Sequence, residues 1–184
     1  RVIGKLASVA AAKAPYLVHF QTYVLRSILS DVIEAANARL IMMSRGRYRL
    51  IHGEGGEKRK WWGLEIDVFD EYTGLPRVSR TLSGGETFLA SLALALGLSD
   101  VVQHYAGGMH LDMIFIDEGF GSLDSETLDI AIRALLEVQQ EGGRLVGIIS
   151  HVEELRARIP VHLEVLRTAN GSKARFTQGG LEAL

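Results

Sequence analysis

Three short stretches of the sequence carry side chains able to bind an anion, hold a cation or move a proton. The first is TLSGGE, which places Ser83, Gly84, Gly85 and Glu86 directly before a run of small and apolar residues. Paired glycines weaken the start of a helix unless something must approach the backbone closely. A serine hydroxyl, two bare amides and the positive end of a helix dipole together predict a site for phosphate or a similar anion.

The same stretch also has a purely structural interpretation. Ser83 and Glu86 match the S-x-x-E capping box, in which the two side chains satisfy amides of the first helical turn. This interpretation accounts for the serine and the glutamate. It leaves Gly84 and Gly85 unexplained.

The second stretch is MIFIDEGFGSLD, in which an apolar strand ends at Asp117 and Glu118. The carboxyl ends of strands are where open α/β sheets bind ligands. Asp117 is suited to hold Mg²⁺, directly or through water, and Glu118 to polarise an attacking water. The structural alternative is two solvated acids at a turn, with Asp124 serving only as the cap of the next helix.

The third feature is His151, which directly follows the apolar strand RLVGIIS. A single histidine after a strand is usually a polar loop residue. If the two strands are neighbours in a parallel sheet, however, His151 emerges at the same sheet edge as Glu118.

The hydrophobic pattern predicts the elements that position these side chains. Apolar positions Phe20, Val24, Ile28, Val32, Ala36 and Leu40 predict a long helix over 16–44. An antiparallel hairpin follows, with strands over 48–51 and 64–68. The remaining elements are helices at 86–105, 125–140 and 152–158 and strands at 113–117, 144–150, 161–167 and 174–177. This order predicts an α/β fold, a mostly parallel sheet with helices on both faces.

Composition excludes several classes of protein. The 184 residues include no cysteine, which excludes disulfides and thiolate metal sites, and the net charge of −2 gives no general reason to bind nucleic acid. No apolar stretch of membrane-spanning length lacks a charge, so we expect no membrane partner. The start at Arg1 leads us to expect an excised fragment.

Four motifs together resemble a known family. LSGGE, IFIDE, SLD and the histidine after the strand occur in the order of the signature motif, Walker B motif, D-loop and H-loop of ABC-class ATPases. The longer sequence RTLSGGETFLASLALALGLSDVVQ, with GRYRL upstream, is similar to the SbcC family, the SMC-like ATPase subunits of bacterial SbcCD nucleases. The resemblance covers the C-terminal half of that family's head. It implies a coiled-coil root helix over 1–44 and an ATPase lobe over 45–184.

The resemblance also implies how the residues act. Two heads would enclose ATP, with Ser83, Gly84 and Gly85 contacting the γ-phosphate of nucleotide held mainly by the opposite head, and with Glu86 completing the signature. Asp117 would serve Mg²⁺. Glu118 would position or activate water, His151 would contact the γ-phosphate, and Asp124 would act across the dimer.

One departure from the family pattern limits what the chain does alone. No G-x-x-x-x-G-K-[ST] stretch is present, and GEGGEKRK at 53–60 has neither the spacing nor the hydroxyl. We therefore expect the chain to need an N-terminal lobe with a Walker A motif before it can hydrolyse ATP.

The resemblance further implies several partners: a second head, an SbcD-like metal-dependent nuclease subunit, and DNA, in the cytoplasm of a bacterium and close to the nucleoid. Basic and aromatic residues that could meet DNA lie at Arg45, Arg47, Arg49 and 58–62. The residues alone favour a solvated hairpin loop with its tryptophans packed into the lobe, and the resemblance shifts the interpretation toward DNA. Two alternatives remain: half of another ABC-class ATPase, SMC-like or from a transporter, and a noncatalytic interaction lobe.

Overall fold

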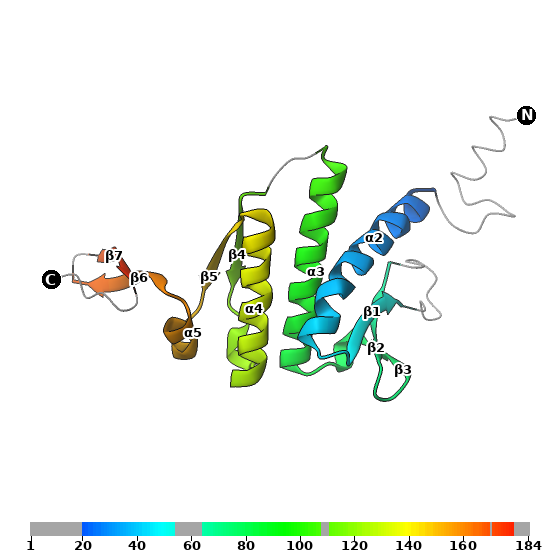
Figure 1. Cartoon of the computed structure of the whole chain (residues 1–184), viewed down its shortest axis with the longest axis horizontal. Helices are drawn as coiled ribbons and strands as arrows, with labels where there is room; N and C mark the ends of the chain where they lie inside the picture. Colours follow the sequence, from blue (N-terminus) through cyan, green and yellow to red (C-terminus); the bar gives the residue numbers. More distant parts are fainter. Residues whose placement is uncertain (1–19, 54–63, 108–110, 170, 179–184) are drawn as a thin grey trace, which may run out of the picture.

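The computed structural model describes residues 20–53, 64–107, 111–169 and 171–178. The elements run α2 (Phe20–Met43), β1 (Tyr48–His52), β2 (Ile66–Asp70), β3 (Leu75–Val78), η2 (Ser79–Thr81), α3 (Gly84–Tyr105), β4 (Met113–Asp117), η3 (Phe120–Ser122), α4 (Ser125–Gly142), β5 (Leu145–Ile149), α5 (Glu153–Arg158), β6 (Val161–Thr168) and β7 (Gly171–Gln178). Figure 1 shows α2, α3 and α4 side by side, with β1–β3 beside α2 and the β6–β7 hairpin at the far end of the molecule.

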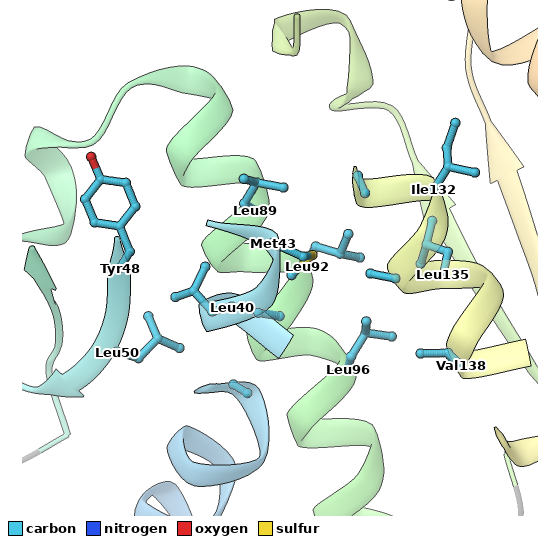
Figure 2. Packing of buried hydrophobic residues seen from close by; sticks show 14 of the residues in the cluster. Leu40, Met43, Tyr48, Leu50, Leu89, Leu92, Leu96, Ile132, Leu135 and Val138 are labelled. Carbon is cyan, nitrogen blue, oxygen red and sulfur yellow. The ribbon is translucent and has the colours of Figure 1, made fainter. Parts of the chain in front are cut away.

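The hydrophobic core lies between the three long helices, and α3 is its central member. Figure 2 shows apolar side chains of α2, β1, α3 and α4 meeting there. The labelled residues are Leu40, Met43, Tyr48, Leu50, Leu89, Leu92, Leu96, Ile132, Leu135 and Val138. The packing of these helices therefore fixes the start of α3, where the signature residues lie.

The predicted apolar face of α2 is buried along only half of its length. Val32, Ala36 and Leu40 lie in the core, whereas Phe20 and Val24 are exposed. The periodicity correctly predicted the helix, but its fully buried positions all lie from Val32 onward. The predicted residues 16–19 lie outside the described part, and the proposed boundary at residue 44 stays a prediction.

β1, β2 and β3 form an antiparallel sheet in which Tyr48 pairs with Asp70 and Leu50 with Val68. The predicted hairpin is confirmed, with its second strand shifted to Ile66–Asp70. β3 was not predicted, because its sequence LPRV contains a proline and shows no clear alternation.

β4 and β5 pair in parallel, with Ile116 opposite Ile148 and Asp117 opposite Ile149. One face of this pair packs on the core. The other face is open, and Phe115 is 68% exposed. The prediction that helices cover both faces is therefore wrong for the described residues. An apolar run indicates that a strand is buried, but it does not indicate which segment covers the strand.

β6 and β7 form an antiparallel hairpin in which Leu163 lies opposite Phe176. Among the described strands the parallel arrangement is confined to β4 and β5. The prediction of a mostly parallel sheet thus holds for that pair alone. The α/β character itself is confirmed.

By length and composition, α3 is the only helix in the described ranges that is long and apolar enough to cross a membrane. A core helix of a soluble protein passes the same test. Leu89, Leu92 and Leu96 of this helix are buried against the other long helices. The helix is thus accounted for as a core helix.

The close contact between α2 and α3 requires a glycine. A Cβ atom on Gly97 would lie 2.6 Å from the Ala36 nitrogen and 2.9 Å from the Val32 carbonyl oxygen. These are backbone atoms, which cannot move aside as a flexible side chain would. The absence of a side chain at Gly97 therefore allows the backbones of α2 and α3 to pack closely at this point.

We predict that Gly97→Ala destabilises the protein, against the usual gain for alanine in a helix. The clash with α2 should lower the free energy of unfolding by about 1–3 kcal/mol. Urea denaturation measures this, with Ser91→Ala on the exposed side of α3 as the matched control. If Gly97→Ala were as stable as that control, the close packing would be contradicted.

Candidate functional site

The start of α3 carries the predicted capping box. The Ser83 hydroxyl accepts a hydrogen bond from the Glu86 amide at 3.3 Å, and the Ser83 amide donates to Glu86 Oε2 at 2.8 Å. The structural interpretation of Ser83 and Glu86 is thus confirmed. It does not exclude a second role for the serine hydroxyl, which is exposed.

Gly84 and Gly85 occupy the first two positions of α3, and their amides have no acceptor within the described residues. Both glycines lie against η3. A Cβ on Gly84 would approach Ser122 Cβ to 3.3 Å, and one on Gly85 would approach the Ser122 carbonyl oxygen to 3.4 Å. Bare amides at a helix start with little room for side chains form a place where an anion can approach the backbone.

These residues line a cavity of about 570 Å³, which we call the signature cavity. Its walls come from the start of α3, the turn between α2 and β1, η3 and the start of α4. The lining residues are Met43, Ser44, Arg45, Arg47, Tyr48, Ser83, Gly84, Gly85, Glu86, Leu89, Ser122, Asp124, Glu126, Thr127 and Ile130. The cavity therefore brings together five predicted residues, Ser83, Gly84, Gly85, Glu86 and Asp124.

Tyr48 holds the carboxylate of Glu86 in place. The Tyr48 hydroxyl donates a hydrogen bond to Glu86 Oε1. Burial, together with the adjacent Glu86 carboxylate, raises the pKa of Tyr48 to about 12. Burial alone would raise the pKa of Glu86, but the hydrogen bonds from Tyr48 and Ser83 outweigh it and lower that pKa. Glu86 thus stays ionised as a fixed acceptor at the helix start.

A buried carboxylate supports this arrangement. Asp70 is 1% exposed, and Arg47 and Arg77 each place a guanidinium nitrogen 3.4 Å from its Oδ2 atom. The same two arginines lie 3.9 Å from the Glu86 carboxylate. Burial would raise the pKa of Asp70, but the Tyr72 amide and the Arg47 guanidinium hold it below its ordinary value. The arginines therefore join the β1–β3 sheet to the start of α3.

Glu118 and His151 meet at the carboxyl ends of β4 and β5, as predicted. His151 Nδ1 lies 3.0 Å from Glu118 Oε2, and both side chains are exposed. The Glu118 amide donates to the Ile149 carbonyl oxygen at 2.9 Å, which fixes the turn after β4 to the neighbouring strand. The parallel pairing of the two strands thus produces the contact.

The turn after β4 is strained. Glu118 has a φ of 60° and Gly119 one of 98°, and left-handed backbone is unfavourable for a residue with a side chain. A Cβ on Gly119 would lie 2.5 Å from the Phe88 ring, so only glycine fits there. Phe88 in turn packs on the buried Phe120, with ring centroids 4.7 Å apart. The core thus forces Glu118 out at the sheet edge.

Asp117 and Asp124 occupy different places. Asp117 ends β4 opposite Ile149, beside Glu118. Asp124 caps α4. Its Oδ1 atom accepts a hydrogen bond from the Thr127 amide at 2.9 Å, and its Oδ2 atom accepts one from the Thr127 hydroxyl. These two hydrogen bonds lower the pKa of Asp124. No group of three or more His, Cys, Asp or Glu residues in the described ranges is arranged to hold a metal ion. Among the described residues, Asp117 thus has no set of side chains that would complete a metal site with it.

The predicted site residues thus form two separate groups. Ser83, Gly84, Gly85, Glu86 and Asp124 line the signature cavity, whereas Asp117, Glu118 and His151 do not line it. The residue patterns alone gave no sign of this division, whereas the family resemblance implied that Ser83, Gly84, Gly85 and Asp124 act across two heads. The roles of all eight residues stay predictions.

The predicted basic patch is largely engaged within the chain. Arg45 pairs with Glu126, and Arg49 Nε donates to Glu71 Oε1 at 2.8 Å. Arg49 also lies over the Phe69 ring at 4.5 Å. The structural interpretation of these arginines is favoured. The cluster at 58–62 lies outside the described residues.

Comparison with known proteins shows what the chain resembles as a whole. A family profile described as "SbcC/RAD50-like, Walker B motif" matches residues 57–137. The chain is 52% identical over 177 residues to the SbcC subunit of the nuclease SbcCD from Vibrio cholerae and 51% identical over 171 residues to that from Staphylococcus epidermidis. These alignments cover 96% and 93% of this chain. The chain is similar to the C-terminal part of SbcC.

The SbcC-like chain spans 17% of the length of these relatives. Solved structures share its fold at low identity. One from work on ATP-driven dimerisation of SMC ATPases has a TM-score of 0.63 at 18% identity, covering 85% of this chain and 89% of that one. An Smc head with an extended coiled coil from Pyrococcus furiosus has a TM-score of 0.59 at 18% identity, covering 96% of this chain and 40% of that one. The fold is that of SMC head domains.

Sequence reasoning missed the residues that support the SbcC-like site. Tyr48 and Arg77 contact Glu86, and Asp70 holds Arg77 in place. The pattern presented the strand of Tyr48 only as part of a hairpin and did not predict the strand of Arg77. An acidic residue at the end of an apolar strand, as in IDVFD, was the one available signal. The role of this acidic residue cannot be recognised until the structure shows the two arginines that pair with it.

We predict that Asp70→Asn destabilises the protein at neutral pH, because it leaves Arg47 and Arg77 facing a buried neutral group. The lowered pKa means that the Asp70 carboxylate stabilises the fold above about pH 4 and that this contribution is lost as the pH falls through the folded-state pKa. Asp70→Asn should therefore also weaken the acid dependence of stability.

Urea denaturation at neutral pH and near pH 3 measures both effects. Glu71→Gln, which breaks the exposed pair with Arg49, is the matched control and should change stability by less than about 1 kcal/mol. Equal effects of the two substitutions at both pH values would show that the Asp70 network does not support the fold.

Proposed function

We propose that this chain is the C-terminal half of an ATP-hydrolysing head in an SbcC-like DNA-processing ATPase. The observation that carries the proposal is the separation of its motif residues into two groups, one around the signature cavity and one at the β4–β5 edge. Two groups that do not share a cavity on one chain can serve one nucleotide if a second head supplies the other group.

In this arrangement Ser83, Gly84 and Gly85 contact the terminal phosphate of ATP seated on the opposite head. The free amides of the two glycines and the dipole of α3 favour the negative charge. Asp124, at the rim of the same cavity, faces the partner head. The capping box keeps the helix start rigid, so that these donors need no reorganisation when the phosphate arrives.

The second group acts on nucleotide held by its own head. Asp117 would hold Mg²⁺ together with phosphate oxygens and water, which fits the lack of a complete metal cluster in the described residues. When bound, Mg²⁺ neutralises charge on the phosphate oxygens. Glu118 orients and polarises the attacking water, and His151 steadies the Glu118 carboxylate and reaches the terminal phosphate.

The open face of β4 and β5 supports the need for another lobe. Met113, Phe115, Leu145 and Ile149 are exposed there, and an apolar patch of this kind is typical of an interface. We assign it to the N-terminal Walker A lobe, without which the chain should not hydrolyse ATP. The exposed first half of α2 would continue into a coiled coil. An SbcD-like nuclease subunit, DNA and a bacterial cytoplasmic location belong to the same proposal.

We predict that Glu118→Gln, in a head assembled with the N-terminal lobe, lowers the rate of ATP hydrolysis by about 10²-fold or more. ATP-dependent dimerisation should persist, because the signature cavity is unchanged. Phosphate release measures the first effect, and light scattering measures the second. Glu153→Gln, the same chemical change on the exposed start of α5, is the control and should hydrolyse ATP normally. Normal hydrolysis by Glu118→Gln would favour a noncatalytic interaction lobe.

A further inference from the structure

Two residues other than glycine adopt left-handed backbone in the described part of the chain, Glu118 with a φ of 60° and Arg45 with a φ of 54°. Such positions are unfavourable for side chains and tend to persist where the side chain has a use. Glu118 already has a place in the proposed site. Arg45 has no place in that site. The neighbouring Gly46 also has a positive φ, which shows that glycine is accepted in this turn.

Arg45 lies at the wall of the signature cavity. It follows α2 in the turn before β1, and it lines the cavity together with Ser83, Gly84 and Gly85. Its guanidinium pairs with Glu126 in the first turn of α4, which also lines the cavity. Both side chains are well exposed, at 58% and 71%. This ion pair therefore joins two walls of the cavity and contributes little to folding.

We propose that Arg45 exchanges Glu126 for the phosphate tail of the nucleoside triphosphate that a second head presents to the signature cavity. The proposal rests on the proposed function and assigns to it a further binding residue. A guanidinium forms paired, charge-assisted hydrogen bonds with phosphate as well as with carboxylate. The triphosphate carries more charge than Glu126 and arrives with its terminal phosphate at the adjacent amides.

Arg47, the other arginine of the cavity, is not suited to this exchange. Its guanidinium is held by the buried Asp70 and lies beside Glu86, so releasing it would leave the buried carboxylate with Arg77 as its one remaining arginine partner. Releasing Arg45 leaves only Glu126, which water can solvate. The exposed pair is thus the one that can open without loss of structure.

The charges of the cavity predict opposite effects for the two members of the pair. Glu86, Asp124 and Glu126 oppose an incoming anion, and Arg45 and Arg47 offset them. Removing Arg45 should weaken capture of the phosphate. Removing the charge of Glu126 should strengthen it, because Arg45 is released and repulsion falls. If the pair were only structural, both substitutions would have the same sign.

The test uses heads assembled from this chain and the N-terminal lobe, with ATP-dependent dimerisation followed by light scattering. Arg45→Gly removes the guanidinium and also relieves the left-handed backbone, so thermal stability should be kept or raised. The ATP concentration for half-maximal dimerisation should rise about tenfold, as expected for loss of a hydrogen-bonded charge. ATP binding by the isolated head should be unchanged. Glu126→Gln should lower the half-maximal concentration.

Arg49→Gln is the matched control, since Arg49 forms the same kind of exposed ion pair two residues past Arg47 but does not line the cavity. It should dimerise like the unaltered head. The proposal is overturned if Arg45→Gly dimerises like Arg49→Gln, or if Arg45→Gly and Glu126→Gln shift dimerisation in the same direction. Failure of the unaltered head to dimerise with ATP would instead overturn the proposed function, and this proposal with it.

Discussion

The structure depends on how the first turn of α3 is held while two of its amides stay open. The first amides of a helix have no partner within the helix itself. Here Ser83 and Glu86 satisfy each other's amides, and η3 packs closely against the two glycines between them. Glu86 is in turn fixed by Tyr48 and by two arginines that share the buried Asp70. The open amides are therefore part of a rigid framework rather than a frayed helix end.

The same core that holds α3 also shapes the second group of residues. Phe120 is buried beneath the turn after β4, and Phe88 of α3 packs on its ring and closes the space above Gly119. This packing explains the left-handed backbone at Glu118, which projects the carboxylate toward His151 at the end of β5. One helix, α3, thus carries Ser83, Gly84 and Gly85 at its start and packs through Phe88 against the turn that carries Glu118.

Much of the local structure could be predicted from the sequence. The strand Met113–Asp117, the cap at Asp124 and the meeting of Glu118 with His151 all follow from short-range patterns or from the rule for parallel neighbours. The division of the site into two groups did not follow from the residue patterns and was implied only by the family resemblance, because the patterns do not say which element ends meet in space. The open face around Phe115 could not be predicted either, since hydrophobicity does not name the segment that covers a strand.

The central claim is that the open amides of this chain hold the terminal phosphate of a triphosphate seated on another head. The most direct measurement is a structure of the Glu118→Gln head, assembled with its N-terminal lobe and trapped with ATP. The account predicts a dimer with the γ-phosphate of each ATP within hydrogen-bonding distance of the Gly84 and Gly85 amides of the opposite head. An ATP-bound dimer in which the signature cavity holds no phosphate would contradict it.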